Sequence, residues 1–352
     1  MFFGKHEKIK NALPASVDGI LLTSGIGQYY ACGFEFEDGY VLITKEKTYL
    51  LCDFRYTESA KAYGCSGALI DDSAHLGDIL CDENIKTLMF EEDFLTVYGL
   101  ERLQTKHSFV KFVKSNGLLK RLRAVKEADE IEYTITAQRI AEKSFTSLLP
   151  LVKEGVTETE LATELEFLMR KNGAGCEAFP TIFISGSSTS KPHGVPENKP
   201  LERGFVTVDF GATYKGYKSD MTRTFSFGKA SGEMKGIYNT VLKAQTKALE
   251  YLECGGRDCF EADRCARDII NEKYNGTFGH SLGHGVGLQI HENPRLSPAV
   301  KGEILVKGHI VTVEPGIYIP HHMGVRIEDM IVVYENTVKN ITEYPKELIE
   351  IC

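Results

Sequence analysis

The sequence predicts an α+β protein of two domains, a smaller α/β domain over residues 1–117 and a larger domain over residues 118–352. At 352 residues, the chain exceeds the size that one hydrophobic core usually reaches. Short apolar strands alternate with helical segments in the first part, which is typical of a small α/β domain. Helical periodicity strengthens after Ser115-Asn116-Gly117, so we expect this turn to link the domains.

The expected strands of the smaller domain are short apolar runs bounded by turn-forming or charged residues. A helix is expected after Asp53, and further helices near residues 74–82 and 94–104. The strands are expected at residues 19–23, 40–44, 48–52, 87–91 and 109–113.

The larger domain begins with two amphipathic helices. Apolar residues from Ile131 to Leu148 recur at three- and four-residue spacing, and Pro150 closes this helix. A capping box at Thr157 opens the second helix, which Gly173 ends. Further helices are expected near 231–252 and 259–275, and these apolar stripes indicate core-facing helices rather than cofactor sites.

Composition and charge exclude several classes of protein. The chain is 42% hydrophobic and 26% charged, as in ordinary globular proteins, and its net charge of −8 disfavours nucleic-acid binding. No apolar run approaches the roughly 18 residues of a membrane span, and no signal peptide is expected at the N-terminus. The nine cysteines have no zinc-binding spacing, which favours free thiols in a reducing compartment. We therefore expect a cytoplasmic protein that binds neither nucleic acid nor membrane.

The segment 205–224 places two aspartates on either side of a glycine-containing turn. Asp209 ends one apolar, β-rich run and Asp220 opens the next. We expect the two residues to lie opposite each other in an antiparallel hairpin, with Cβ atoms about 5 Å apart. Two carboxylates at that distance repel each other unless a cation lies between them. The hairpin therefore predicts one half of a metal site.

A second pair of carboxylates lies near the C-terminus, in strands expected at 310–319 and 325–334. If these strands pair around His321, Glu314 and Glu328 also face each other. His284 lies between glycines, where the backbone can approach a ligand closely.

Together these five side chains make an oxygen-rich set of ligands with one imidazole. Such a set suits Mn²⁺ first, with Co²⁺ or Zn²⁺ as alternatives, and four carboxylates fit two ions better than one. Taken singly, each residue also fits an ordinary role as a turn residue, a strand residue or a loop histidine. Spacing alone leaves both interpretations open.

Four motifs resemble the metallopeptidase family with the pita-bread fold, in the proline-specific branch of Xaa-Pro aminopeptidases and Xaa-Pro dipeptidases (prolidases). They are VDFGATYKGYKSDMTRTF, GHSLGHGVGLQIHENP, VTVEPGIYIP and GVRIEDMIVV, in the family's order. The resemblance covers nearly the whole chain, and it implies a creatinase-like α/β domain over 1–117 and a pita-bread catalytic domain over 118–352. Methionine aminopeptidase normally lacks the first domain, and creatinase lacks the complete metal set, so both are disfavoured.

The resemblance also implies which residues bind metal. Asp209 would bind one divalent ion, and His284 and Glu314 the other. Asp220 and Glu328 would bridge both ions, and Glu314 would also shuttle a proton.

Five further residues match positions around the substrate in this family. His291 would stabilise the tetrahedral intermediate, and His193 is expected to act in catalysis with it and with Glu314. The substrate-binding residues implied by the resemblance are His193, His280, His291, Arg326 and Tyr318.

The activity implied by the resemblance is hydrolysis of the bond between an N-terminal residue and proline. We expect the Xaa-Pro aminopeptidase type first, with a dipeptidase restricted to Xaa-Pro as the alternative. A non-catalytic binding module with this fold is the remote alternative. The substrates would be Xaa-Pro peptides, and the resemblance implies a homodimer.

Overall fold

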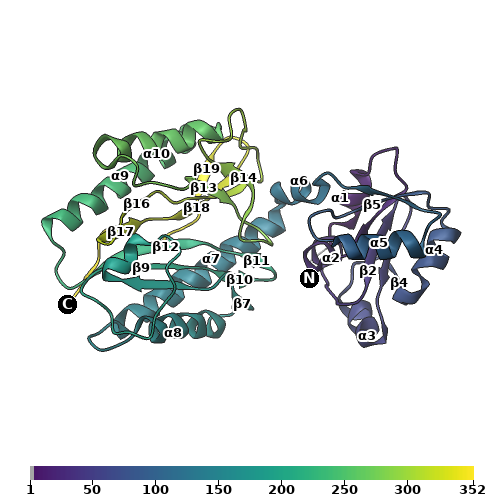
Figure 1. The fold of residues 1–352 in the computed structure, drawn as a ribbon, viewed down its shortest axis with the longest axis horizontal. Helices are drawn as coiled ribbons and strands as arrows, with labels where there is room; N and C mark the ends of the chain where they lie inside the picture. The colour runs from purple at the N-terminus through teal and green to yellow at the C-terminus, as the bar shows by residue number, and fades with distance from the viewer. Residues whose placement is uncertain (1–3) are drawn as a thin grey trace. The chain divides into compact units, whose positions relative to one another are not determined.

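The computed structural model describes residues 4–352, and the chain divides into two compact units, Met1–Arg123 and Ala124–Cys352 (Figure 1). The division falls a few residues after the turn at 115–117. Within residues 4–352, no helix combines the length and the apolar character that crossing a membrane requires.

The first unit is built on a mixed six-stranded sheet with the order β4-β3-β2-β1-β5-β6. The strands β1, β2 and β3 pair antiparallel, and the outer pairs are parallel. The strands are β1 (Gly19–Leu22), β2 (Tyr40–Thr44), β3 (Thr48–Leu51), β4 (Leu69–Asp71), β5 (Thr87–Phe90) and β6 (Lys111–Lys114). The helices are α1 (His6–Asn11), α2 (Gly25–Cys32), α3 (Phe54–Tyr63), α4 (Leu76–Asp82), α5 (Val97–Lys106) and α6 (Leu118–Ala124), the last of which runs across the division.

The expected strands and helices of this unit are present within a few residues of their predicted bounds. The strand β4 and the helix α2 were not expected, and both omissions have local causes. The strand β4 is three residues long and mostly exposed, so it lacks the apolar run that marked the others. The helix α2 contains two glycines within eight residues, which lowers its intrinsic helix propensity. Its Ser24 cap and the left-handed Gly33 that follows it define its two ends.

The second unit contains two larger sheets, with the orders β20-β12-β9-β8 and β14-β13-β15-β18-β19. A third sheet, β11-β10-β7, and the hairpin β16-β17 extend them. The strands are β7 (Cys176–Glu177), β8 (Ile182–Ser185), β9 (Gly204–Phe210), β10 (Ala212–Tyr214), β11 (Tyr217–Lys218), β12 (Met221–Phe227), β13 (Gly283–Gly285), β14 (Glu292–Leu296), β15 (Ile310–Val313), β16 (Gly316–Ile319), β17 (Met323–Arg326), β18 (Asp329–Val333), β19 (Val338–Asn340) and β20 (Glu350–Ile351).

Helices cover both sides of these strands (Figure 1). The helices α7 (Ala128–Leu148) and α8 (Glu158–Lys171) form one apolar core with β8, β9 and β12. The helices α9 (Gly232–Glu253) and α10 (Cys259–Tyr274) form the other core with β15–β18. The capping box predicted at Thr157 is present, with Glu160 as its second member. The helical expectations for this unit are therefore confirmed, and the strands between the two helical layers carry the polar site described next.

Candidate metal centre

Asp209 and Asp220 come from adjacent strands, but they are not directly opposed. In the β9–β12 ladder Asp209 pairs with Thr222, and β12 begins only at Met221. The expectation that the two aspartates face each other is therefore wrong by two residues. The chain leaves the ladder after Phe210 to form β10 and β11, and this detour decides the offset. Both aspartates still line one cavity.

Glu314 and Glu328 lie opposite each other, as predicted, although neither is inside a strand. The β15–β18 ladder ends with Val313 paired to Asp329, and the β16–β17 ladder begins with Gly316 paired to Arg326. Both ladders have the same register, which places Glu314 opposite Glu328 in the gap between them. The two long strands expected here are thus each interrupted, and Pro315 contributes to the gap because it has no N–H group to donate.

In this gap the glutamate backbones bond to other strands. The N–H of Glu314 donates to the carbonyl oxygen of Leu282 at 2.7 Å, and the N–H of Glu328 donates to that of Thr222 at 3.1 Å. The first bond brings Glu314 beside the His284 segment, and the second brings Glu328 beside the aspartate hairpin. These two bonds therefore bring together ligands from three parts of the chain.

One imidazole and three carboxylates meet at this point. Ligand atoms of Asp220, His284 and Glu328 all lie within 4.8 Å of one another. The Nε2 atom of His284 is 3.5 Å from Oδ2 of Asp220 and 3.4 Å from Oε1 of Glu314. Its Nδ1 atom lies 3.0 Å from the carbonyl oxygen of Gly285, which can only accept, so Nδ1 carries the proton. The Nε2 lone pair is then free to bind a cation.

The electrostatics of these carboxylates fit divalent metal ions. Burial, followed by repulsion from neighbouring carboxylates, raises the pKa of Asp220 and Glu328 well above the usual range. Burial raises the pKa of Glu314 to about 8, and burial lowers that of His284 to about 3. In addition, the buried Oδ1 atom of Asp209 has no hydrogen-bond partner among the described residues. Buried cations would remove the repulsion and satisfy this oxygen.

Arg326 connects Asp209 to the residues around it. Its Nη2 donates to Oδ2 of Asp209 at 2.7 Å, and its Nη1 donates to the Tyr318 hydroxyl at 2.7 Å. That hydroxyl is 3.0 Å from Nε2 of His280, whose Nδ1 lies 2.8 Å from the carbonyl oxygen of Ser281. Burial lowers the pKa of His280 to about 4, so its ring is neutral and Nε2 accepts from Tyr318. Arg326 is thus held by Asp209 and Tyr318, and Tyr318 by Arg326 and His280. Arg326 lines the cavity and Tyr318 does not.

A cavity of about 560 Å³ opens over the carboxylates. Ile182, Val195 and Phe179 form apolar walls, and His193 and His291 lie on its exposed side. The rings of His284 and His291 meet edge to face with centroids 4.4 Å apart. All predicted site residues except Tyr318 line this cavity, namely Asp209, Asp220, His193, His280, His284, His291, Glu314, Arg326 and Glu328. Their individual roles remain predictions.

Arg295 is a cavity residue that sequence reasoning missed. It lines the cavity, is exposed, and has no hydrogen-bond or ion-pair partner among the residues that the structure describes. It lies in β14 opposite His284, although the register shifts just after that pair. Exposed and buried residues alternate from His291 to Arg295 in the structure and place both on one side, but the sequence of this segment does not alternate between polar and apolar residues and so gave no signal.

Comparisons with known proteins agree with this geometry. The model of metallopeptidase family M24 matches residues 132–335, and that of the creatinase/prolidase N-terminal domain matches residues 7–125. The Xaa-Pro dipeptidase of Pyrococcus horikoshii is 38% identical over 353 residues, covering 98% of this chain and 99% of that protein.

Two solved structures are also similar over nearly their whole length. The Xaa-Pro dipeptidase of Bacillus anthracis has a TM-score of 0.93 and 41% identity, with 99% of each chain covered. The X-Pro aminopeptidase of Thermotoga maritima has a TM-score of 0.92 and 33% identity, with 99% of this chain and 100% of that chain covered. The predicted family and fold class are therefore confirmed. The chain belongs to metallopeptidase family M24 and has its two-domain pita-bread architecture with a creatinase/prolidase N-terminal domain.

Proposed function

We propose that the chain is an Xaa-Pro dipeptidase that depends on two divalent metal ions. The observation that carries this proposal is a set of four carboxylates, three of them beside one neutral imidazole, that line a cavity which also exposes an unpaired arginine. The aminopeptidase type was the first expectation from sequence. The similar proteins named Xaa-Pro dipeptidase favour the alternative instead.

The metal ligands in this proposal are the five residues that the family resemblance implies. Asp209 would hold one ion and His284 and Glu314 the other, while Asp220 and Glu328 would be shared. Mn²⁺ is the proposed metal because carboxylate oxygens predominate, with Co²⁺ or Zn²⁺ as alternatives. When bound, the ions supply Lewis acidity and lower the pKa of water, so that a nucleophile is present near neutral pH.

The remaining chemistry belongs to side chains of this protein. Glu314 carries a proton from the attacking water to the prolyl nitrogen, which must be protonated before it can leave. That nitrogen is part of a tertiary amide without an N–H group, so no donor from the substrate has to be satisfied there. Burial, followed by the charge of Arg295, lowers the pKa of His291, so its neutral ring can donate a hydrogen bond to the developing oxyanion. His193, on the same exposed side of the cavity, would act with it.

Arg295 supports the dipeptidase over the aminopeptidase. In an Xaa-Pro dipeptide, proline carries the free carboxylate, which a guanidinium can bind through two parallel hydrogen bonds. A longer peptide has a neutral amide at that position and leaves the cation without a partner. An unpaired arginine at the cavity therefore fits the shorter substrate better.

The proposal also covers the oligomeric state and the location of the protein. We propose a homodimer, which the family resemblance implies, and a cytoplasmic location, which fits the absence of disulfides among the described cysteines. The binding-module alternative is disfavoured because every position that matches a metal ligand of the family keeps a ligating side chain.

The deciding experiment compares chain lengths on one purified, Mn²⁺-loaded protein. Rates would be measured for an Xaa-Pro dipeptide, for the same sequence extended to Xaa-Pro-Yaa, and for an Xaa-Ala dipeptide as the control for proline. We expect the Xaa-Pro dipeptide to be cleaved far faster than either of the other two substrates. If Xaa-Pro-Yaa is cleaved faster than the dipeptide, the protein is an Xaa-Pro aminopeptidase instead. No cleavage of any of the three substrates would favour a binding module.

A further inference from the structure

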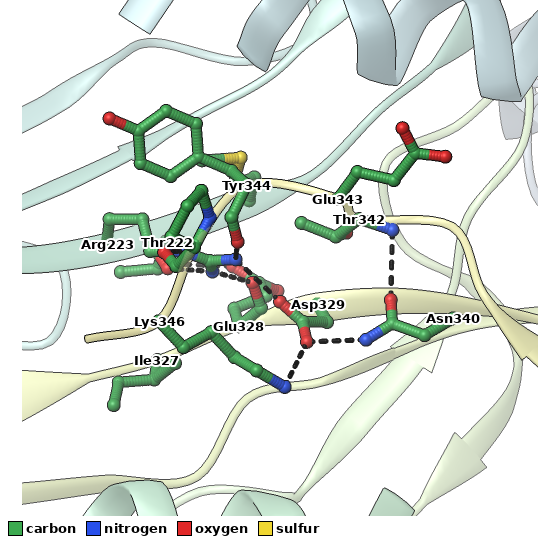
Figure 2. A network of polar contacts seen from close by, with 12 residues as sticks. Thr222, Arg223, Ile327, Glu328, Asp329, Asn340, Thr342, Glu343, Tyr344 and Lys346 are labelled. Atoms are coloured by element: carbon green, nitrogen blue, oxygen red, sulfur yellow. Dashed lines mark hydrogen bonds and ion pairs between the residues drawn. The ribbon is translucent and has the colours of Figure 1, made fainter. Parts of the chain in front are cut away.

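Arg223 and Asp329 form a buried ion pair next to the carboxylate cluster (Figure 2). Nη2 of Arg223 is 2.8 Å from Oδ1 of Asp329, and the two side chains are 4% and 0% exposed. Arg223 follows Thr222, whose hydroxyl donates to the Glu328 carboxylate, and Asp329 follows Glu328 itself. Because successive residues in extended chain point to opposite sides, the pair lies on the side away from the cavity.

The guanidinium of Arg223 donates all five of its N–H groups. Nη1 donates to the carbonyl oxygens of Thr222 at 2.9 Å and Glu328 at 2.6 Å. The remaining donors reach Asp329 and the carbonyl oxygens of Tyr344 and Pro345, at 2.7 and 3.0 Å. One planar group therefore joins β12, the Glu328 peptide and the C-terminal segment.

Asp329 is fixed by partners of its own. Its Oδ2 atom accepts from Nδ2 of Asn340 at 2.7 Å and from Nζ of Lys346 at 2.8 Å, as Figure 2 shows. The carboxylate thus holds the guanidinium in place from a second direction. Such networks lock the orientation of a group more firmly than one ion pair does.

This pair supports the backbone of Glu328, where no regular β-ladder does. Glu328 lies in the gap between the β15–β18 and β16–β17 ladders. Its N–H donates to the backbone carbonyl oxygen of Thr222 in β12. The hydroxyl of Thr222 donates to Oε2 of Glu328 at 2.6 Å, which fixes one carboxylate oxygen. Arg223 holds the carbonyl groups of both residues that make this contact.

We propose that Arg223, held by Asp329, is a positioning residue for Glu328 and thereby sets the affinity of the site for metal. The inference rests on the proposed two-metal function. Partners that orient a metal ligand typically contribute 10- to 100-fold in metal affinity. A pair that only stabilised the fold would lower the unfolding temperature and leave the affinity of the folded protein unchanged.

The test is titration calorimetry of metal-free protein with Mn²⁺, comparing wild type with Arg223→Lys. Lysine keeps the positive charge beside Asp329 but cannot reproduce the planar fork of donors. Arg257→Lys is the matched control, because Arg257 also donates to backbone carbonyl oxygens, those of Leu252 and Gly256, outside the cavity. We expect about 10- to 100-fold weaker binding of at least one ion in Arg223→Lys and wild-type binding in Arg257→Lys.

Wild-type affinity for both ions in folded Arg223→Lys would overturn the inference while the proposed function stands. If Arg223→Lys does not fold, Asp329→Asn replaces it, and the rise in Tm with Mn²⁺ concentration is measured. This rise reports the Kd of the folded protein independently of its stability without metal, so a wild-type concentration dependence would again overturn the inference. A wild-type protein that binds no Mn²⁺ would instead contradict the proposed function.

Discussion

Glu314 and Glu328 lie opposite each other at a gap between two β-ladders that share one register. They form a non-hydrogen-bonded pair of this register, because the next pair, Pro315 and Ile327, carries the N–H to carbonyl bond. Their own N–H groups therefore point away from each other and donate to the carbonyl oxygens of Leu282 and Thr222. These two bonds attach the glutamates to the histidine segment and the aspartate hairpin, and so bring distant ligands to one point.

From this arrangement we predict that Glu314→Gln removes nearly all turnover of an Xaa-Pro dipeptide while the protein stays folded. Loss of a proton-transferring group typically costs 10²- to 10⁴-fold, and loss of a metal-binding carboxylate adds to it. The measurement is the hydrolysis rate with excess Mn²⁺, with circular dichroism to confirm folding. Glu303→Gln, outside the cavity, is the control. Near-wild-type rates for Glu314→Gln would contradict the proposed role of Glu314 in proton transfer and metal binding.

A second prediction concerns His291, which lies on the exposed side of the cavity and not among the clustered ligand atoms. We expect His291→Ala to lower kcat by about 10²- to 10³-fold, as removal of an oxyanion donor does, and to keep its bound metal. Metal content measured by elemental analysis separates the two roles. Loss of bound metal would instead mean that His291 is a metal ligand. The control is His322→Ala, outside the cavity, which should change neither kcat nor the metal content.

Much of the fold was predictable because its signals are local. The capping box at Thr157 and the apolar periodicity of α7 depend on residues a few positions apart. The opposition of Glu314 and Glu328 was also predictable, because one turn at 320–324 sets the register between them.

Long-range relationships were not predictable in this way. The offset between Asp209 and Asp220 depends on the detour through β10 and β11, which no local pattern marks. Arg223 lies 106 positions from Asp329 in the sequence, and neither residue carries a spacing signal that indicates the other. Arg295 was missed because a single arginine on a strand resembles any solvated residue until the cavity beside it is known.

A third prediction is that metal binding releases protons. Burial raises the pKa of Glu314 to about 8, so Glu314 retains its proton at pH 7 without metal, and burial also raises the pKa of Asp220 and Glu328. Metal ligands must be deprotonated, so Mn²⁺ affinity should rise with pH up to about 8. Calorimetry in two buffers of different ionisation enthalpy counts the protons released. Glu314→Gln should release fewer, and equal binding heats in both buffers for the wild type would contradict the protonated state.

A fourth prediction addresses the length of the substrate through Arg295. We expect Arg295→Met to raise KM for an Xaa-Pro dipeptide and to lower kcat/KM by roughly 10- to 100-fold, since hydrogen bonds to a charged group contribute about 1.5–3 kcal/mol. The weak cleavage of the amidated substrate Xaa-Pro-NH₂ should hardly change, because it offers no carboxylate to the guanidinium. Arg295→Lys should recover part of the loss, since lysine keeps the charge but not the planar fork. Equal losses for the free and the amidated dipeptide would mean that Arg295 shapes the cavity without binding the carboxylate, and the argument for a dipeptidase would lose its structural support.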